Sequence, residues 1–279
     1  MVNAGVAAPG GRVLAICADD VGLADGAADT ALDLVAAGRL TSASCVSTGP
    51  FWHGDGPRLG GLELGLHFNL TEGSPASRSL SAHWPTLPGL GLLIARAHLG
   101  ALPLAAIADE WQAQLDAFAE RTGREPDFID GHQHVHHLPG VRDIVLASAA
   151  RFRVAPAIRS TGRVMGPGAA FKRRVIEASG GRALEAALRR RGVRHNRALL
   201  GAYDFHGDYR DHVVAWLAAA PAEGGLLFCH PSSAPGGDAI ADARRREAAY
   251  LASDAFAGDL AAAGISLGSA WATRSSSAG

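Results

Sequence analysis

The stretch RVLAICADD, residues 12–20, begins the pattern that decides the fold of this chain. It is an apolar run of the length of a buried strand, and it ends in two aspartates. The helical-looking segment DGAADTALDLVAAGRL, residues 25–40, follows it almost directly. An apolar strand followed by a helix is the repeating unit of parallel α/β folds, so this stretch predicts a βα unit.

The same alternation continues along nearly the whole chain, with about eight strand candidates separated by helical segments. The later strand candidates lie within 42–48, 62–70, 126–131, 157–160, 198–205, 225–231 and 265–270. The helices are expected within 104–123, 141–151, 171–192 (broken at Gly180-Gly181), 209–220 and 242–264. The pattern predicts an α/β fold around a parallel sheet. Periodicity alone is compatible with a closed or distorted (β/α) barrel and with an open doubly wound sheet.

The chain shows no internal repeat and no interdomain linker, so we expect one domain over residues 10–272. Residues 71–103 are rich in Gly, Pro and Ser and too long for an ordinary loop. They are interpreted as a lid or substrate-binding insertion. The small polar tail at residues 273–279 is expected to be frayed.

Composition narrows the class of protein. With 26 Lys+Arg and 27 Asp+Glu the formal net charge is −1, so no general attraction to nucleic acid is expected. No apolar stretch is long enough for a membrane span, and the start lacks the pattern of a signal peptide. The three cysteines are far apart and lie in apolar runs. They are interpreted as buried free thiols, which predicts a cytoplasmic protein.

Polar residues recur where the predicted strands end. They are Asp19, Asp20, His67, the segment Asp130–His134, Arg159 and His230. Each has a purely structural interpretation: a helix cap for an aspartate, a hydrogen-bonded core histidine, or a surface arginine. Because the carboxyl ends of parallel strands meet at one edge, we instead expect these residues to converge there, where ligands bind in such folds.

The residue types at that edge suit a metal-dependent hydrolase. Carboxylate and neutral imidazole are ligands for divalent ions such as Zn²⁺ and Mn²⁺. His132, His134 and His136 alternate, so they would share one face of an extended segment, although not all can bind one ion. Asp19 is a candidate general base, and His230 a candidate acid or oxyanion support. Arg159 could orient the base carboxylate or a substrate oxygen.

At these residues the chain resembles the carbohydrate deacetylase family known as YdjC, or ChbG/HpnK. The matching segments occur in the family's order and span most of the chain: ADDVGLADG (18–26), LTSAS (40–44), GLHFNLTEG (65–73), FIDGHQHVHHLP (128–139), IRS (158–160) and CHP (229–231). The resemblance implies a distorted, TIM-like (β/α) barrel related to polysaccharide deacetylases. It also implies hydrolysis of the acetamide of an N-acetylated amino sugar.

The resemblance implies specific roles for the matching residues. Asp20, His67 and His132 would be ligands of one divalent ion, Mg²⁺ or Zn²⁺. Asp19 would be the base and His230 the acid. Arg159, His134 and Asn69 are weaker candidates for substrate contacts.

Members of the family are described as cytoplasmic and often dimeric, so a homodimer is expected. The substrate would be an N-acetylated sugar, an oligosaccharide or a glycolipid head group. The chain departs from the family pattern at Val21, where Phe is usual, and at Ala24, where Ser is frequent. Neither position supplies a ligand.

Other functions are compatible with the same residues. A metal-dependent phosphoesterase or esterase would use the same residues to cleave a phosphoester or ester bond, although phosphoester hydrolysis favours two metal ions. A non-catalytic sugar-binding barrel would not need Asp19 beside the ion. A glycoside hydrolase is disfavoured because no carboxylate pair suited to a glycosidic bond is evident.

Overall fold

The computed structural model describes residues 12–271, so the predicted tail at 273–279 lies outside the described residues. Eight strands form one sheet within this range. They are β1 (Arg12–Val21), β2 (Ser42–Cys45), β3 (Glu63–Phe68), β4 (Phe128–Gly131), β5 (Ala157–Ile158), β6 (Leu199–Leu200), β7 (Gly225–Cys229) and β8 (Ile265–Leu267). The strand candidates of the sequence are therefore confirmed, although the one at 198–205 is reduced to two residues.

The sheet curls into a distorted barrel. The strand order is β5-β4-β3-β2-β1-β7-β6, and the start of β1 also pairs with β8. Every paired set of strands is parallel. Beyond β5 and β6, an isolated bridge between Val164 and Leu199 connects the two ends of this order. The barrel is thus confirmed, and the open doubly wound alternative is wrong.

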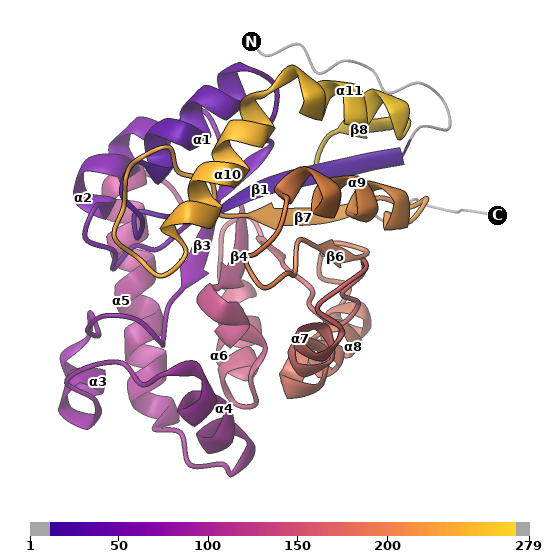
Figure 1. Cartoon of the computed structure of the whole chain (residues 1–279). Coiled ribbons are helices and arrows are strands. Elements are labelled where there is room, and N and C mark those ends of the chain that lie inside the picture. The colour runs from indigo at the N-terminus through magenta and orange to yellow at the C-terminus, as the bar shows by residue number, and fades with distance from the viewer. Residues whose placement is uncertain (1–11, 272–279) are drawn as a thin grey trace.

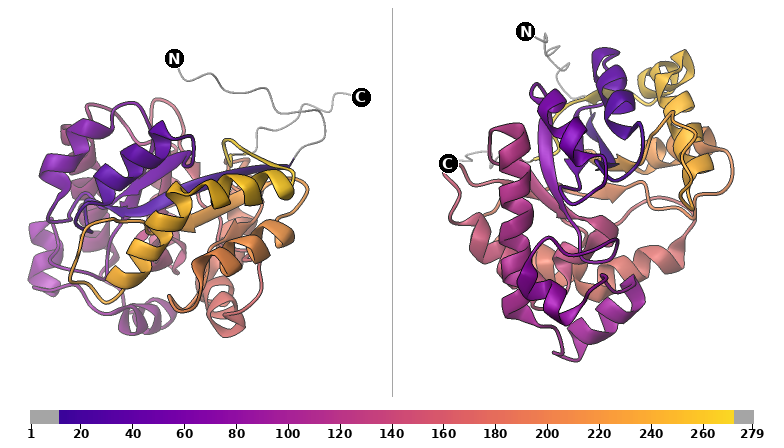
Figure 2. Two further views of the ribbon diagram at one scale, coloured as in Figure 1. Left: turned by 45° about the horizontal axis from the view of Figure 1, so that its top comes forward. Right: turned by 90° about the vertical axis from the view of Figure 1, so that its left-hand side faces the viewer.

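Helices surround the curled sheet in both views of Figure 2. They are α1 (Ala27–Ala36), α2 (Trp52–Asp55), α3 (Arg78–His83), α4 (Leu90–His98), α5 (Leu104–Thr122), α6 (Val141–Ala149), α7 (Ala170–Ile176), α8 (Arg182–Arg191), α9 (Tyr209–Ala219), α10 (Ala241–Ala252) and α11 (Asp254–Ala262). Short 3₁₀ segments η1 (Gly56–Leu59) and η2 (His132–His137) and a π-turn η3 (Glu177–Gly181) complete the elements. In the described chain, no helix is long and apolar enough to cross a membrane.

Two predicted helical regions differ in detail. The break at Gly180-Gly181 is confirmed, because η3 separates α7 from α8. The single helix expected within 242–264 is wrong. It divides into α10 and α11 at Ser253, which has extended backbone and whose side-chain oxygen accepts a hydrogen bond from Phe256 N. A serine in this position caps the second helix and ends the first.

The segment 71–103, interpreted from the sequence as a lid or substrate-binding insertion, contains regular helices. It carries α3 and α4, which lie at the lower end of the molecule in Figure 1. Ser77 caps α3, and its backbone N–H donates to the buried carboxylate of Glu110 on α5. His98 of α4 lies 3.1 Å from the carbonyl oxygen of Ser179 in η3. These contacts fix α3 and α4 against the barrel.

Successive strand residues face opposite sides of the barrel wall. Outward-facing residues of β1, such as Leu14 and Ile16, join the large apolar cluster beneath the helices. Inward-facing residues, such as Cys17 and Phe228, join a second cluster that fills the barrel interior. At Gly65 of β3 an added Cβ would lie 2.1 Å from the ring of Phe128. Glycine is therefore needed there to let that ring fill the interior.

Candidate active site

The candidate site is the last layer of side chains inside the barrel. Asp19 follows Cys17 on the inward face of β1, and His230 follows Phe228 after β7. His67, Asp130 and Arg159 hold the corresponding inward positions at the ends of β3, β4 and β5. A two-residue period thus places five polar side chains from five strands above the apolar interior.

The two adjacent aspartates face different surroundings because the strand is irregular between them. Strict alternation would turn Asp20 outward, toward the helices. The pairing of β1 with β2 shifts register between Ala18 and Val21, and Asp20 has a φ of 64°. Aspartate tolerates this left-handed conformation better than most residues. The irregularity brings Asp20 to the inside of the barrel next to Asp19.

Asp20, His67 and His132 form a compact group of potential metal ligands. One donor atom from each lies within 4.8 Å of the other two, and all three residues are buried. Asp20 Oδ1 lies 2.9 Å from His132 Nδ1 and 3.5 Å from His67 Nε2. The structure therefore brings together the three residues named as ligands from the sequence.

His67 is oriented from behind by buried polar groups. Its Nδ1 lies 2.7 Å from Asp130 Oδ1 and 3.0 Å from Ser44 Oγ, which leaves Nε2 facing Asp20. A carboxylate behind a metal-binding histidine fixes the ring and its tautomer. Burial alone would lower the pKa of His67, but Asp130 and Asp19 outweigh it and raise this pKa to about 10.

Asp20 and His132 also have charged partners. Arg244 of α10 donates to Asp20 Oδ2 at 2.8 Å, so only Oδ1 faces the two histidines. His132 Nε2 lies 3.1 Å from Glu72 Oε2. Burial raises the pKa of Asp20, yet His132 outweighs it and holds this pKa well below its usual range.

The donor chemistry fits a divalent cation. Carboxylates outnumber guanidinium groups around the three residues, since Asp19, Asp20, Asp130 and Glu72 face only Arg159 and Arg244. In the neutral form that binds a metal ion the two histidines add no charge, so the carboxylates exceed the guanidinium groups by two negative charges. One carboxylate and two imidazoles are a common ligand set for divalent ions and leave coordination positions open.

Asp19 is held by a buried guanidinium. Arg159 NH1 lies 2.6 Å from Asp19 Oδ2 and NH2 lies 2.7 Å from Oδ1. The same NH2 lies 2.5 Å from Asp130 Oδ2. Arg159 is completely buried, so the sequence alternative of a surface arginine is wrong. Of the two orienting roles considered from the sequence, contact with the base carboxylate is the one that this geometry supports.

His230 lies across the cavity from the histidine pair and belongs to a second buried network. Its backbone N–H donates to Glu247 of α10, and its Nδ1 lies 3.9 Å from Glu247 Oε1. Tyr203 donates a 2.5 Å hydrogen bond to that same oxygen. The buried Nδ1 of His230 has no hydrogen-bond partner, and the residue lines the cavity.

The histidine-rich segment departs from its sequence interpretation. Residues 132–137 form the 3₁₀ segment η2 and not an extended strand, and Gln133 and His134 have φ values of 51° and 64°. The prediction that His132, His134 and His136 share one face is therefore wrong. His132 joins Asp20 and His67, while His136 is buried with Nε2 2.9 Å from the carbonyl oxygen of Arg159.

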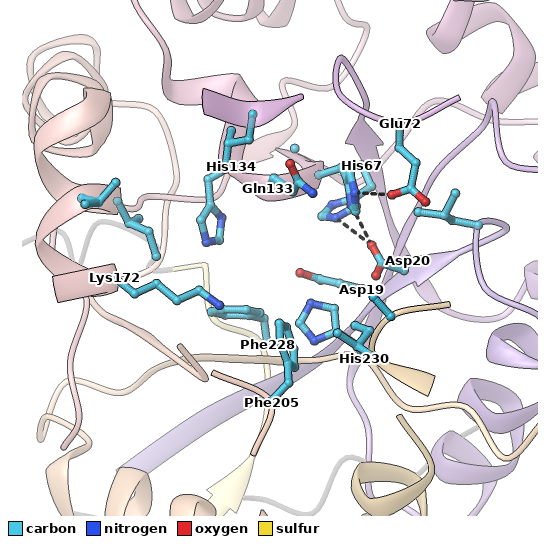
Figure 3. A pocket seen from close by; sticks show the side chains of 18 of the residues that line it. Asp19, Asp20, His67, Glu72, Gln133, His134, Lys172, Phe205, Phe228 and His230 are labelled. Atoms are coloured by element: carbon cyan, nitrogen blue, oxygen red, sulfur yellow. Dashed lines mark hydrogen bonds and ion pairs between the residues drawn. The ribbon is translucent and has the colours of Figure 1, made fainter. Parts of the chain in front are cut away.

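One cavity of about 620 Å³ is lined by Asp19, Asp20, His67, His132 and His230. Figure 3 shows His134 and Lys172 on the side opposite Asp20, with Phe205, Phe228 and His230 between. The side chain of His134 has no hydrogen-bond partner at Nδ1, and burial lowers its pKa well below the usual value. His134 therefore faces the cavity as a neutral imidazole.

The other two weaker candidates do not line this cavity. Asn69 is buried and hydrogen-bonds the loop that follows β3, and Arg159 lies behind Asp19. A direct substrate contact by either residue is therefore not part of this geometry. Both instead position cavity residues.

Sequence reasoning missed several charged residues of the site. Glu72 and Asp130 lie inside segments that had been recognised but were given no role. Arg244 and Glu247 share the face of α10 that also buries Ala248 and Leu251. Charged residues on the apolar stripe of a helix were the available signal. Lys172, which was given no role from the sequence, also lines the cavity.

The fold and the site define a class: an α/β barrel with a buried Asp/His/His group at its strand ends. The family described as YdjC-like protein matches residues 13–262. The chain therefore belongs to the YdjC-like family, and the resemblance stated from its motifs is confirmed.

Three curated relatives have informative names. A Homo sapiens carbohydrate deacetylase is 31% identical over 242 residues, covering 78% of this chain and 74% of that protein. A Mus musculus carbohydrate deacetylase is 35% identical over 162 residues, covering 53% and 52%. A chitooligosaccharide deacetylase of Enterobacter sp. (strain 638) is 34% identical over 154 residues, covering 52% and 58%. The matches thus span from about half to about three quarters of these proteins.

A solved structure supports the fold. A putative cellobiose-phosphate cleavage protein from Enterococcus faecalis V583 superposes with a TM-score of 0.68 at 21% identity, covering 92% of this chain and 97% of that one. At this identity the likeness concerns the fold alone.

Proposed function

We propose that this protein is a metal-dependent deacetylase that hydrolyses the acetamide of an N-acetylated amino sugar. The observation that carries the proposal is the convergence of Asp20, His67 and His132 beside Asp19 in one cavity. The names of the curated relatives point to the same reaction. A divalent ion held by the three ligands would supply Lewis-acid polarisation of the acyl oxygen and activation of a water.

Asp19 is proposed to take the proton of the attacking water. Arg159 holds both carboxylate oxygens, which fixes the orientation of this group beside the cavity. A base needs a defined position within hydrogen-bond reach of the water. The buried guanidinium supplies that position without taking part in proton transfer itself.

His230 is proposed to give a proton to the departing amine. His230 lines the cavity, and Glu247 Oε1 lies 3.9 Å from its buried Nδ1. A positioned imidazole can give a proton to a leaving group that comes within hydrogen-bond reach. The acid and the base then lie at neighbouring positions, just after the paired residues Cys229 of β7 and Ala18 of β1.

The same geometry favours one ion over two. A second group of potential ligands, Cys17, Asp19 and Asp130, lies below the first. The guanidinium of Arg159 contacts all three and supplies the positive charge that a second ion would bring. This speaks against a two-metal phosphoesterase. A non-catalytic sugar-binding barrel would give no reason for a bidentate clamp on Asp19.

The mouth of the cavity favours an amino sugar with an apolar substituent. Leu90 and Ile94 of α4 and Phe171 and Val175 of α7 line it, and the Phe171 side chain is 81% exposed. In each helix the two residues are four apart and share one face. Among the substrates considered from the sequence, a glycolipid head group with its attached chain suits these surfaces best.

Acetate release from N-acetylglucosamine, its oligomers and an alkyl N-acetylglucosaminide tests this proposal. We expect activity that disappears with a chelator and returns with added Zn²⁺ or Mg²⁺. The alkyl glycoside should have the lowest KM. Release of phosphate from sugar phosphates without release of acetate, or activity that is indifferent to chelation, would overturn the assignment.

A further inference from the structure

The residues around the candidate metal site differ in how deeply their charged partners are buried. Asp20, His67 and Asp19 each contact a buried charged group, namely Arg244, Asp130 and Arg159. His132 alone among these four has a partner, Glu72, whose side chain is 51% exposed. The role of this half-exposed carboxylate is not explained by the hydrolysis itself.

The two histidines turn opposite ring nitrogens toward Asp20. His67 faces Asp20 Oδ1 with Nε2 and places Nδ1 against Asp130. His132 faces the same oxygen with Nδ1 and places Nε2 against Glu72. A neutral imidazole has one proton, and the nitrogen that binds an ion cannot carry it. Each ring therefore needs an acceptor for the N–H on its far side.

We propose that Glu72 is the positioning residue for His132: its carboxylate accepts the Nε2–H and presents Nδ1 to the metal ion. The inference rests on the metal site of the proposed function. Asp130 does the same for His67 with the ring nitrogens reversed. Carboxylates behind ligating histidines fix the tautomer and raise the basicity of the ligand.

The loop that carries Glu72 is built to hold its backbone. Asn69 Oδ1 accepts hydrogen bonds from the backbone N–H groups of Thr71 and Glu72, at 3.0 and 3.1 Å. Asn69 Nδ2 donates to the carbonyl oxygen of Glu72 at 2.7 Å. Gln114 of α5 exchanges hydrogen bonds with the Asn69 backbone. Through these contacts Asn69 holds the backbone of Glu72 in place at the cavity mouth.

The tautomers can be observed directly in Zn²⁺-loaded protein by ¹⁵N NMR of the histidine rings, with His132→Gln and His67→Gln variants for assignment. We expect His132 to carry its proton on Nε2 and His67 to carry it on Nδ1. A proton on His132 Nδ1 in the loaded protein would overturn the proposal, whatever the enzyme activity.

Metal affinity provides the second measurement, by competition for Zn²⁺ with a chelator. Glu72→Ala should weaken binding by about tenfold to a hundredfold. Glu72→Gln should bind more tightly than Glu72→Ala, because its amide oxygen can accept the same hydrogen bond. Asp143→Ala, which removes an exposed carboxylate in the first turn of α6, is the matched control and should bind like the natural protein. Unchanged affinity in Glu72→Ala would overturn the proposal.

A direct metal–Glu72 bond is the competing explanation, and it predicts a different result. In Co²⁺-loaded protein, loss of a ligand would change the intensity of the visible absorption bands equally in Glu72→Ala and Glu72→Gln. The positioning role predicts that the Gln variant keeps the original spectrum. None of these measurements requires a substrate. An inactive protein with the expected tautomers would therefore overturn the deacetylase proposal and leave this one intact.

Discussion

The inner wall and the outer rim of the cavity differ in how deeply their side chains are buried and in whether those side chains have partners inside the protein. The inner wall, taken together with the polar layer directly behind it, consists of Asp19, His67, Asp130, His136 and Arg159, and each is at most 2% exposed. The outer rim consists of Glu72, Leu90, Ile94, Phe171 and Val175, all partly or largely exposed. In the wall, polar and charged side chains from four strands and η2 contact partner groups inside the protein. In the rim, apolar side chains from two helices and one carboxylate face the cavity and the solvent.

This difference suits the wall to the chemical step and the rim to the selection of the substrate. Charges buried in the wall hold their geometry without reorganisation, which is what an acid–base site requires. Each costs desolvation and is tolerated only because a partner compensates it. The apolar side chains of the rim have no such internal partners and gain contacts only when something occupies the cavity. Changes in the wall should therefore affect stability and rate strongly, whereas changes at the apolar rim residues should affect substrate binding weakly.

Removing Arg159 should have the largest effect. Arg159→Met leaves Asp19 and Asp130 buried without their shared cation, and we expect a loss of about 3–5 kcal/mol in the free energy of unfolding. Denaturant titration measures this loss. Arg189→Met breaks an exposed ion pair with Glu185 on α8 and should cost less than about 1 kcal/mol. Equal effects of the two variants would contradict the proposed importance of the wall.

Asp19→Asn tests the same wall through catalysis. The variant keeps the shape of the side chain but cannot take a proton, so kcat should fall by about 10²–10⁴-fold. Metal content, measured by elemental analysis, should be unchanged because Asp19 is not among the proposed ligands. Full turnover by Asp19→Asn would refute its role as base, and loss of the ion would make it a ligand.

His136 makes the wall sensitive to acid. Burial lowers the pKa of His136 to about 4, whereas the unfolded side chain titrates near ~6.5. As pH falls through this window the unfolded chain takes up the proton first, so stability should decrease by up to about 3 kcal/mol. Unfolding free energies from pH 7 to pH 4 should fall less steeply in His136→Gln. Parallel curves would contradict the assignment.

His230→Ala should act on rate with a smaller effect than Asp19→Asn. Loss of the proposed acid is expected to lower kcat by about 10²-fold, the lower end of the range for such groups. Substrates with a better leaving group, such as an N-acetylated nitroaniline, should lose less. An equal loss for both substrates would argue that His230 is structural.

Changes in the rim should be the mildest. Phe171→Ser removes apolar contact worth roughly 1 kcal/mol, so KM for an alkyl glycoside should rise about fivefold. Plain N-acetylglucosamine should be unaffected. Leu99→Ser is the matched control, because Leu99 is also 81% exposed but does not line the cavity. A similar change in both variants would remove the distinction between rim and ordinary surface.

Much of this protein could be predicted from the sequence. The alternation of apolar runs and helical segments predicted the α/β barrel, because strand and helix periods are local properties of the chain. The ends of those runs marked Asp19, Asp20, His67 and His230. Side-chain parity along a strand carries three of them to the inner face, whereas Asp20 reaches it only through the irregularity of β1. The motifs then assigned the family.

Only the tertiary structure decided which charges compensate one another. Arg244 and Glu247 look like ordinary helix residues until α10 packs against the barrel and turns them inward. Glu72 reaches His132 across a separation of 60 residues. The path of His132–His137 depends on left-handed backbone at two non-glycine residues, which neighbouring contacts must stabilise. Local sequence sets the period of each element, but the electrostatic partners of a buried charge come from wherever packing brings them.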